Sequence, residues 1–193
     1  MKNLFIIDGA AGTGKSDLLK YLAKEKQGVG IMKKITTRDM RDEEKVSDYI
    51  LDLEFDKRKF YDSCNDSDFY KYVYRGEQYG FFKSDLKNKL SYHNNVVIII
   101  RNNDLVNLIK IDFPDIKIIF VYICSDTAQV ERRLKKIGYN EAKIELRRAA
   151  YQRTLNDYMK YSKDYDEVLI NNSDTVQYES LIDQLFAKYN IQQ

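Results

Sequence analysis

The sequence predicts an α/β fold in three layers, with a central parallel sheet, a small inserted arm and a helical lid. Two observations predict it. An apolar run at residues 4–7 leads through a glycine-rich turn into a segment with leucines at helical spacing. Apolar, β-branched runs at residues 96–100 and 116–123, of the type buried between layers of helices, then alternate with helical patterns. Repeated strand–helix units of this kind imply a doubly wound core.

The other elements are expected in chain order from the same patterns. The second strand is expected at residues 29–35, and a short crossover helix at 105–111 ends before Pro114. After the strand at 116–123, the patterns predict a helix at 128–136, a long helix at 141–161, a last strand at 168–170 and a last helix at 178–189.

Residues 36–90 interrupt this alternation. They are dense in Tyr, Phe, Asp, Lys and Arg and lack any long apolar run, which favours short strands and turns. The chain has one proline and no Ser/Gly-rich run that would indicate a linker between domains. We therefore expect a single domain over residues 1–193, with a core at 1–35 and 91–193, an arm at about 36–90 and a lid at about 137–148.

The composition excludes several classes of protein. Hydrophobic residues make up 44% and charged residues 32%, as in a globular chain rather than a disordered one. Lys and Arg exceed Asp and Glu by only 32 − 30 = 2, so the net charge gives no argument for binding to nucleic acid or membranes. Cys64, Cys124 and the single His93 lack the spacing of a metal site or a Cys/His catalytic pair. The longest apolar run is far short of the ~20 residues that cross a bilayer, and the start does not resemble a signal peptide, so we expect a cytoplasmic monomer or homodimer.

The strongest signal in the chain is a phosphate-binding loop. Residues 9–16 match the spacing G-x-x-x-x-G-K-[ST] at every fixed position, between a strand and a helix. Such glycines let successive backbone N–H groups converge on phosphate oxygens at the positive end of the following helix. The sequence therefore predicts that ATP is bound by Gly9, Ala10, Ala11, Gly12, Thr13, Gly14, Lys15 and Ser16.

Two side chains of this loop have more specific expected roles. Lys15 supplies a positive charge for the β- and γ-phosphates, and the Ser16 hydroxyl is the expected ligand of a phosphate-bound Mg²⁺ ion. The loop by itself leaves open whether the phosphoryl group goes to water, to a small molecule or nowhere.

A second anion site is indicated twenty residues after the loop. Residues 36–41 read Thr-Thr-Arg-Asp-Met-Arg, and two arginines three apart can converge on one phosphate with forked donors. This segment resembles the T-T-R-x-x-R motif of the guanylate kinase family, and the likeness continues with Asp48-Tyr49 and Gln78-Tyr79-Gly80. The resemblance implies that the phosphate of an acceptor nucleotide is bound by Arg38, Arg41, Tyr49 and Tyr79.

The resemblance extends over nearly the whole chain. Arg132-Arg133-Leu134 falls where the family has an arginine–leucine pair before its lid, and residues 144–152 resemble the lid helix. Residues 168–171 resemble a strand near the adenine site, which implies that Asn171 contributes to binding the cofactor. Taken together, the resemblance implies ATP and Mg²⁺ as cofactors and catalytic roles for Lys15, Arg38, Arg133 and Arg147.

Departures from the family gather at the positions that read guanine. The family has a Ser or Thr, a Glu and acidic residues at the strand end, where this chain has Phe81, Tyr70, and Ile99 with Arg101. An arginine cannot accept a hydrogen bond from the guanine ring N–H as a carboxylate does. We expect a retained phosphate clamp beside an altered base site, in which the two aromatic rings offer stacking surface. Asp8 and Asp104 are the candidates to support the magnesium ion, and helix-capping or turn roles are the alternative for both.

The preferred hypothesis is an ATP-dependent phosphotransferase that acts by in-line transfer on a nucleoside monophosphate, either GMP-like or of altered base specificity. Two alternatives stay open at this point. One is a guanylate-kinase-like binding module that has lost turnover, and the other is a kinase for a phosphorylated non-nucleotide metabolite. The sequence does not determine the acceptor.

Overall fold

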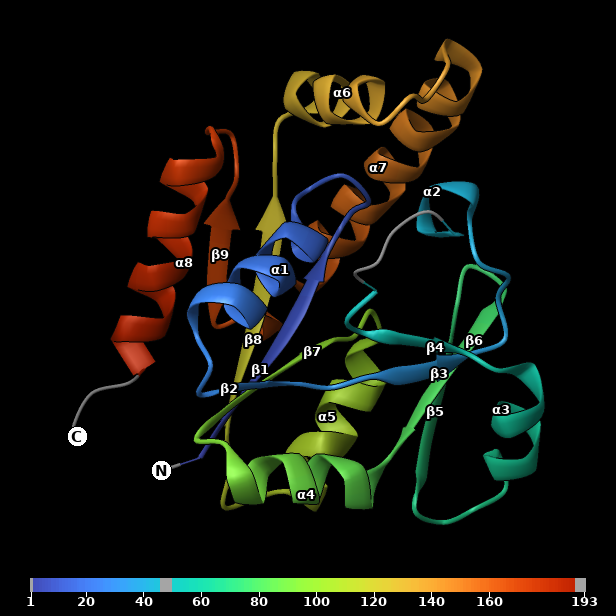
Figure 1. Cartoon of the computed structure of the whole chain (residues 1–193), viewed down its shortest axis with the longest axis vertical. Helices are drawn as coiled ribbons and strands as arrows, with labels where there is room; N and C mark the ends of the chain where they lie inside the picture. The colour runs from blue at the N-terminus through green and yellow to red at the C-terminus, as the bar shows by residue number, and fades with distance from the viewer. Residues whose placement is uncertain (1, 46–49, 190–193) are drawn as a thin grey trace. The chain divides into compact units, whose positions relative to one another are not determined.

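The computed structural model describes residues 2–45 and 50–189, and Figure 1 labels its elements. Within these residues the central sheet has five strands in the order β2-β7-β1-β8-β9. Their bounds are Val29–Ile31, Asn95–Ile99, Asn3–Gly9, Lys117–Cys124 and Glu167–Ile170, respectively. Strand β2 pairs with β7 and β8 pairs with β9, both in parallel. The predicted α/β class with a central parallel sheet is confirmed.

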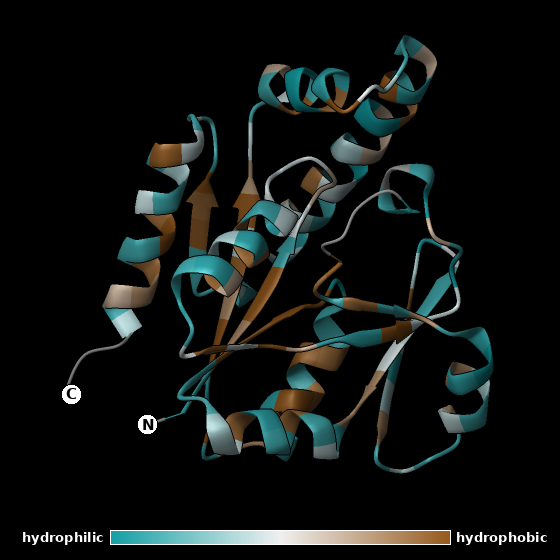
Figure 2. Ribbon diagram, viewed as in Figure 1, coloured by the Kyte–Doolittle hydropathy of each residue, from teal (hydrophilic) through white to brown (hydrophobic). Residues whose placement is uncertain are grey.

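Burial explains why these runs form inner strands. Every residue of β1 and of β7 is buried, and Figure 2 shows β8 and β9 in the brown of hydrophobic residues. Strands that are apolar on both faces are typical of parallel sheets that are covered on both sides. In the described part of the chain, no helix is long and apolar enough to span a membrane.

The chain divides into two compact units. One comprises Met1–Ile6 and Leu22–Ile118, and the other comprises Ile7–Tyr21 and Ile119–Gln193. We call them the first and the second unit.

The first unit contains a second sheet, with the strand order β4-β3-β6-β5 among the described residues. Strand β3 (Lys34–Thr36) is parallel to β4 (Leu53–Phe55) and antiparallel to β6 (Glu77–Phe82), which forms a hairpin with β5 (Phe69–Tyr74). The hairpin turn has Arg75 at φ 53° and Gly76 at φ 80°, as two-residue turns that match strand twist require. The helices of this unit are α2 (Asp42–Lys45), α3 (Lys57–Ser63), α4 (Lys83–Tyr92) and α5 (Asn103–Asp112).

Two expectations for this region need correction. The single strand expected at residues 29–35 is wrong, because β2 belongs to the central sheet and β3 to the second sheet. The arm also contains helix as well as strands and turns. Helix α3 is capped by Asp56, whose carboxylate accepts from the Lys59 N–H at 2.8 Å, and its Phe60 packs in a cluster with Ile35 and Phe69.

The second unit holds the phosphate loop. Helix α1 (Lys15–Glu25) starts in it, and β8 leads to α6 (Thr127–Lys136) and the long α7 (Glu141–Tyr161). A 3₁₀ turn (Ser162–Asp164), β9 and α8 (Thr175–Tyr189) complete it. Asp126 and Asn140 cap α6 and α7 with side-chain oxygens. An apolar cluster then packs the start of the loop against both helices, through Ala10, Val130, Leu134, Ile144 and Tyr151.

Candidate functional site

The phosphate loop lies between the end of β1 and the start of α1. Gly12 and Gly14 adopt left-handed backbone, with φ of 83° and 103°. A Cβ on Gly14 would collide with the Asn171 side-chain nitrogen and lie 3.1 Å from the Tyr178 ring. The loop therefore depends on glycine at this position for its close fit to two other segments of the second unit.

The last two residues of the loop, Lys15 and Ser16, have polar side chains in different surroundings. Lys15 Nζ donates to the backbone carbonyls of Gly9 at 2.7 Å and Ala10 at 2.5 Å, so its ammonium lies across the loop. Ser16 is exposed in the first turn of α1. The first N–H groups of any helix have no partner within the helix, and together with the dipole they favour an anion at this end. This part of the second unit therefore has the donors that a phosphate chain needs.

Three side chains hold the loop from behind. Asn171 is buried, and its amide donates to the Thr13 carbonyl at 2.9 Å, while the Tyr178 hydroxyl donates to the Gly14 carbonyl at 3.1 Å. Arg133 donates to the Gly12 carbonyl at 3.3 Å and to the Asn171 side-chain oxygen at 2.8 Å. In a trans peptide the carbonyl and the following N–H point in opposite directions. With the carbonyls of Gly12, Thr13 and Gly14 bonded to these side chains, the N–H groups that follow them point away from those side chains, which fits anion binding.

Arg133 therefore has a position that the sequence did not reveal. Besides its bonds to the loop and to Asn171, its guanidinium donates to Ser125 Oγ at 3.0 Å. Burial lowers the pKa of this guanidinium, against the attraction of Asp17. The structure brings Arg133 and Asn171 together at the back of the loop.

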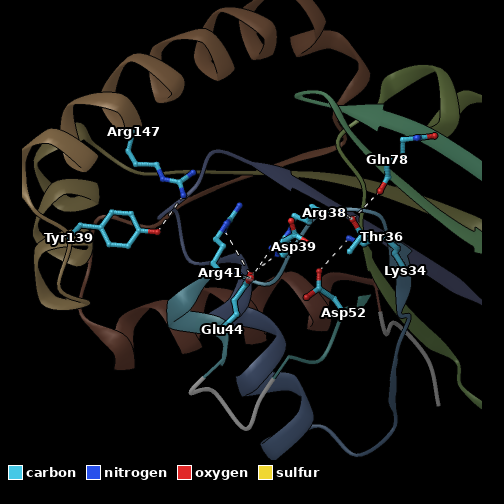
Figure 3. Close-up of polar contacts among 10 residues, drawn as sticks. All are labelled: Lys34, Thr36, Arg38, Asp39, Arg41, Glu44, Asp52, Gln78, Tyr139 and Arg147. Atoms are coloured by element: carbon cyan, nitrogen blue, oxygen red, sulfur yellow. Dashed lines mark hydrogen bonds and ion pairs between the residues drawn. The ribbon is translucent and has the colours of Figure 1, made fainter. Parts of the chain in front are cut away.

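Arg147 lies two turns into α7, in the segment expected to form the lid. Its guanidinium donates to the Tyr139 hydroxyl at 3.3 Å and lies 5.6 Å from the centre of that ring (Figure 3). Its neighbour Arg148 instead pairs with Glu131 at 2.7 Å and with Glu145, on the exposed side of the helix. Of the two, Arg147 is the one that the structure places beside a lid tyrosine.

The arginine pair of the first unit surrounds one carboxylate. The Arg38 guanidinium donates to both oxygens of Glu44, at 2.7 and 2.6 Å, and the Arg41 backbone N–H donates to Glu44 Oε2 at 2.8 Å (Figure 3). The Arg41 guanidinium lies 3.9 Å from Glu44 Oε1 and is 44% exposed, so it can reach a ligand. In this structure the anion that both arginines contact is the Glu44 carboxylate, and their binding of an acceptor phosphate stays a prediction.

The positive charges of Arg38 and Arg41 affect the pKa of two neighbouring side chains, Glu44 and Tyr79. Burial opposes the charge of Glu44, but hydrogen bonds from Arg38 and from the Arg41 N–H outweigh it and lower the pKa of the carboxyl. Burial raises the pKa of the Tyr79 hydroxyl, while the charges of Arg38 and Arg41 and a hydrogen bond with Arg38 act to lower it. Tyr79 thus lies beside both arginines. Tyr49 lies outside the described residues.

Sequence reasoning missed a buried lysine next to this group. Lys34 begins β3, and its Nζ donates to the Ile99 carbonyl at 2.5 Å and to Asp52 at 3.3 Å. Burial lowers the pKa of Lys34, Asp52 acts to raise it, and the charges of Arg101 and Arg38 lower it further. The only sign of it in the sequence is a pair of lysines, Lys33 and Lys34, within the otherwise apolar run at 29–35.

The two aromatic residues expected at the base site have another role. Tyr70 and Phe81 are 2% and 1% exposed and pack edge to face, with ring centres 5.3 Å apart. The Tyr70 hydroxyl donates to Asp112 at 2.6 Å, at the end of α5. Both rings belong to the core of the first unit in this structure, so the expectation that they offer stacking surface is wrong.

The two acids considered for magnesium support differ in environment. Asp8 is buried at the end of β1, where it accepts from the Gly9 N–H at 2.6 Å and from the Tyr165 hydroxyl at 2.7 Å. Asp104 is exposed in the first turn of α5. Asp8 is therefore the acid that holds the first residue of the loop.

Comparisons with known proteins agree with one another. A family model described as guanylate kinase matches residues 1–188. A curated guanylate kinase of Pasteurella multocida (strain Pm70) is 27% identical over 177 residues, which cover 88% of this chain and 80% of that protein. The crystal structure of guanylate kinase from Anaplasma phagocytophilum has a TM-score of 0.64 at 14% identity and covers 99% of this chain and 87% of that chain. At this identity, the structural likeness shows the fold.

Proposed function

This chain belongs to the guanylate kinase family, and on that premise we propose that it transfers the γ-phosphoryl group of Mg·ATP to the phosphate of a nucleoside monophosphate. Its family and fold are those of a nucleotide kinase. The observation that carries the proposal is the presence of two separate sets of anion-binding groups. One is the glycine loop with Lys15, and the other is the fork of Arg38 beside Arg41.

The loop is proposed to bind the donor. When bound, Mg·ATP supplies the phosphoryl group and a divalent cation that neutralises its phosphate oxygens. The residues present fit this cofactor, because the left-handed Gly12 and Gly14 let backbone N–H groups approach phosphate oxygens without side chains in the way. Lys15 would exchange its bonds to loop carbonyls for bonds to phosphate oxygens, and the exposed Ser16 hydroxyl would ligate the magnesium ion.

The arginine pair is proposed to bind the acceptor. Arg38 presents a guanidinium fork that holds a carboxylate with two parallel bonds, and the same fork matches two oxygens of a phosphate. Arg41, 3.9 Å from the same carboxylate, and the Tyr79 hydroxyl, which lies beside Arg38 and Arg41, would add donors to a bound phosphate. The acceptor phosphate would replace the Glu44 carboxylate at one or both arginines.

The reaction itself needs no protein nucleophile. An oxygen of the acceptor phosphate forms the new bond to the γ-phosphorus, the bond to the β-bridging oxygen breaks, and ADP leaves. Positioned cations stabilise the charge that spreads over the transferred group, and Lys15, Arg38 and Arg147 are the proposed sources. Arg133 is proposed to support them by holding the loop. We also propose that residues 1–193 act as a single functional domain, because turnover needs both ligands.

The test is an acceptor panel. Purified protein is mixed with Mg·ATP and each of GMP, dGMP, AMP, CMP, UMP, dTMP, IMP and XMP, and formation of ADP is followed. Lys15→Ala and Arg38→Ala should abolish turnover. Lys20→Ala, on the exposed side of α1, is the matched control and should leave it unchanged. No ADP above the Lys15→Ala background with any acceptor would contradict the proposal.

A further inference from the structure

The first unit carries a group of donor side chains next to the arginine pair. Lys34 and Asp52 form a buried ion pair at 3.3 Å, with side chains 4% and 18% exposed. The Lys34 ammonium also bonds the carbonyl of Ile99, two residues before Arg101. The charge of Arg101 lies close enough to act on Lys34. We call Lys34, Asp52, Tyr74 and Arg101 the Lys34 cluster.

Tyr74 ends β5 at the tip of the hairpin, where two guanidinium groups meet its ring. Arg101 lies 4.1 Å from the ring centre and Arg75 lies 5.2 Å from it. The Tyr74 hydroxyl is buried and has no hydrogen-bond partner among the residues that the structure describes. A buried hydroxyl normally has a hydrogen-bond partner, and a ligand atom would supply the partner that the Tyr74 hydroxyl lacks.

The Lys34 cluster lies close to Arg38 of the arginine pair. Lys34 and Arg38 are four residues apart on β3 and its extension, and four extended residues span at most about 13 Å. The charge of Arg38 also acts on Lys34. A phosphorylated molecule of nucleotide size that is held at Arg38 by its phosphate can therefore reach the cluster with its other end.

Donors outnumber acceptors in the cluster. Lysine and arginine can only donate hydrogen bonds, while a tyrosine hydroxyl can donate one and also accept. Asp52 is the acidic member, and its Oδ2 accepts from the Lys34 ammonium at 3.3 Å. N–H groups of a ligand that faced Lys34 and Arg101 would stay unpaired, whereas oxygens would be bonded.

We propose that the end of the acceptor opposite its phosphate is an anionic, oxygen-rich group, bound by Arg101 and the Tyr74 hydroxyl beside Lys34. This inference rests on the proposed binding of the acceptor phosphate at the arginine pair. The inference names a substrate class for the base site. A negatively charged base with oxygens on its ring is favoured over a neutral base that presents N–H groups.

Three nucleotides of the same shape test the inference. GMP, IMP and XMP differ at one ring position, which carries an amino group, a hydrogen or an oxygen, and the xanthine base loses a proton near neutral pH. Binding is measured by calorimetry without ATP at about pH 7.5. We expect XMP to bind about tenfold more tightly than GMP, with IMP between them. GMP binding as tightly as XMP, or no binding of XMP, would overturn the inference.

Variants separate ligand binding from a structural role of Arg101. Arg101→Gln should remove the preference for XMP and leave GMP binding within about twofold, and Tyr74→Phe, which keeps the ring under Arg101, should reduce the preference partly. Arg58→Gln is the control, because Arg58 is 92% exposed on α3. If Arg101→Gln weakens all three nucleotides equally, Arg101 only fixes the hairpin and the inference fails. Tight XMP binding without ADP formation would instead contradict the kinase proposal and leave this inference standing.

Discussion

Arg38 and Glu44 form a two-pronged ion pair, with both carboxylate oxygens 2.6 to 2.7 Å from guanidinium nitrogens. Glu44 thereby fixes the orientation of the Arg38 guanidinium, and its contact with the Arg41 N–H holds the start of α2. The pair both organises the proposed acceptor site and occupies it.

The Arg38–Glu44 pair predicts a pH-dependent contribution to stability. The pKa of Glu44 is lowered in the folded protein, so the stabilisation is present above the unfolded value of about 4.3 and is lost as the pH falls through the folded pKa. Glu44→Gln should lower the free energy of unfolding by about 1–3 kcal/mol at pH 7. Urea denaturation at pH 7 and near pH 3 measures it. An equal loss at both pH values would contradict the account.

Gly14 predicts a sharp steric limit in the phosphate loop. Gly14→Ala places a Cβ against the Asn171 amide and the Tyr178 ring, at a backbone φ of 103°. We expect a loss of about 1–3 kcal/mol in stability and a loss of ATP binding. Thermal unfolding and binding of a fluorescent ATP analogue test this. Gly28→Ala is the matched control, because nothing lies within 4 Å of its added Cβ. Similar effects of the two substitutions would refute the steric argument.

The contacts of Arg133 with the loop predict that its substitution changes KM for ATP more than kcat. Arg133→Lys keeps the charge, but a lysine cannot donate at once to Gly12, Ser125 and Asn171. If Arg133 positions the loop, KM for ATP rises about tenfold or more while kcat changes less. A fall in kcat at unchanged KM would instead indicate that Arg133 acts on the transferred group in the transition state. Steady-state kinetics decide, with the exposed neighbour Arg132→Lys as the control.

Much of the fold could be predicted from local patterns. The helix expected at 141–161 is α7 with the same bounds, and the strands expected at 96–100 and 116–123 are β7 and β8 to within one residue. Long or strongly apolar segments determine their own secondary structure with little help from the rest of the chain. The family resemblance read from the loop and the arginine motif is confirmed by the family model.

The rest depends on contacts between distant residues. The break between β2 and β3 follows from pairing with two different sheets, and periodicity carries no signal for a change of sheet. The position of Arg133 depends on Gly12, 121 residues away, and that of Lys34 on Ile99, 65 residues away. Tyr70 and Phe81 were expected to face a ligand, but β5 and β6 pair so that both rings are buried in the core.

In the proposed reaction a phosphoryl group passes from ATP to the phosphate of a nucleoside monophosphate. Phosphorus NMR of the protein with Mg·ATP and either XMP or GMP follows both products directly. We expect ADP together with the matching nucleoside diphosphate in equal amounts, and neither product with Lys15→Ala. Release of inorganic phosphate alone, or no loss of ATP with any acceptor of the panel, would contradict it.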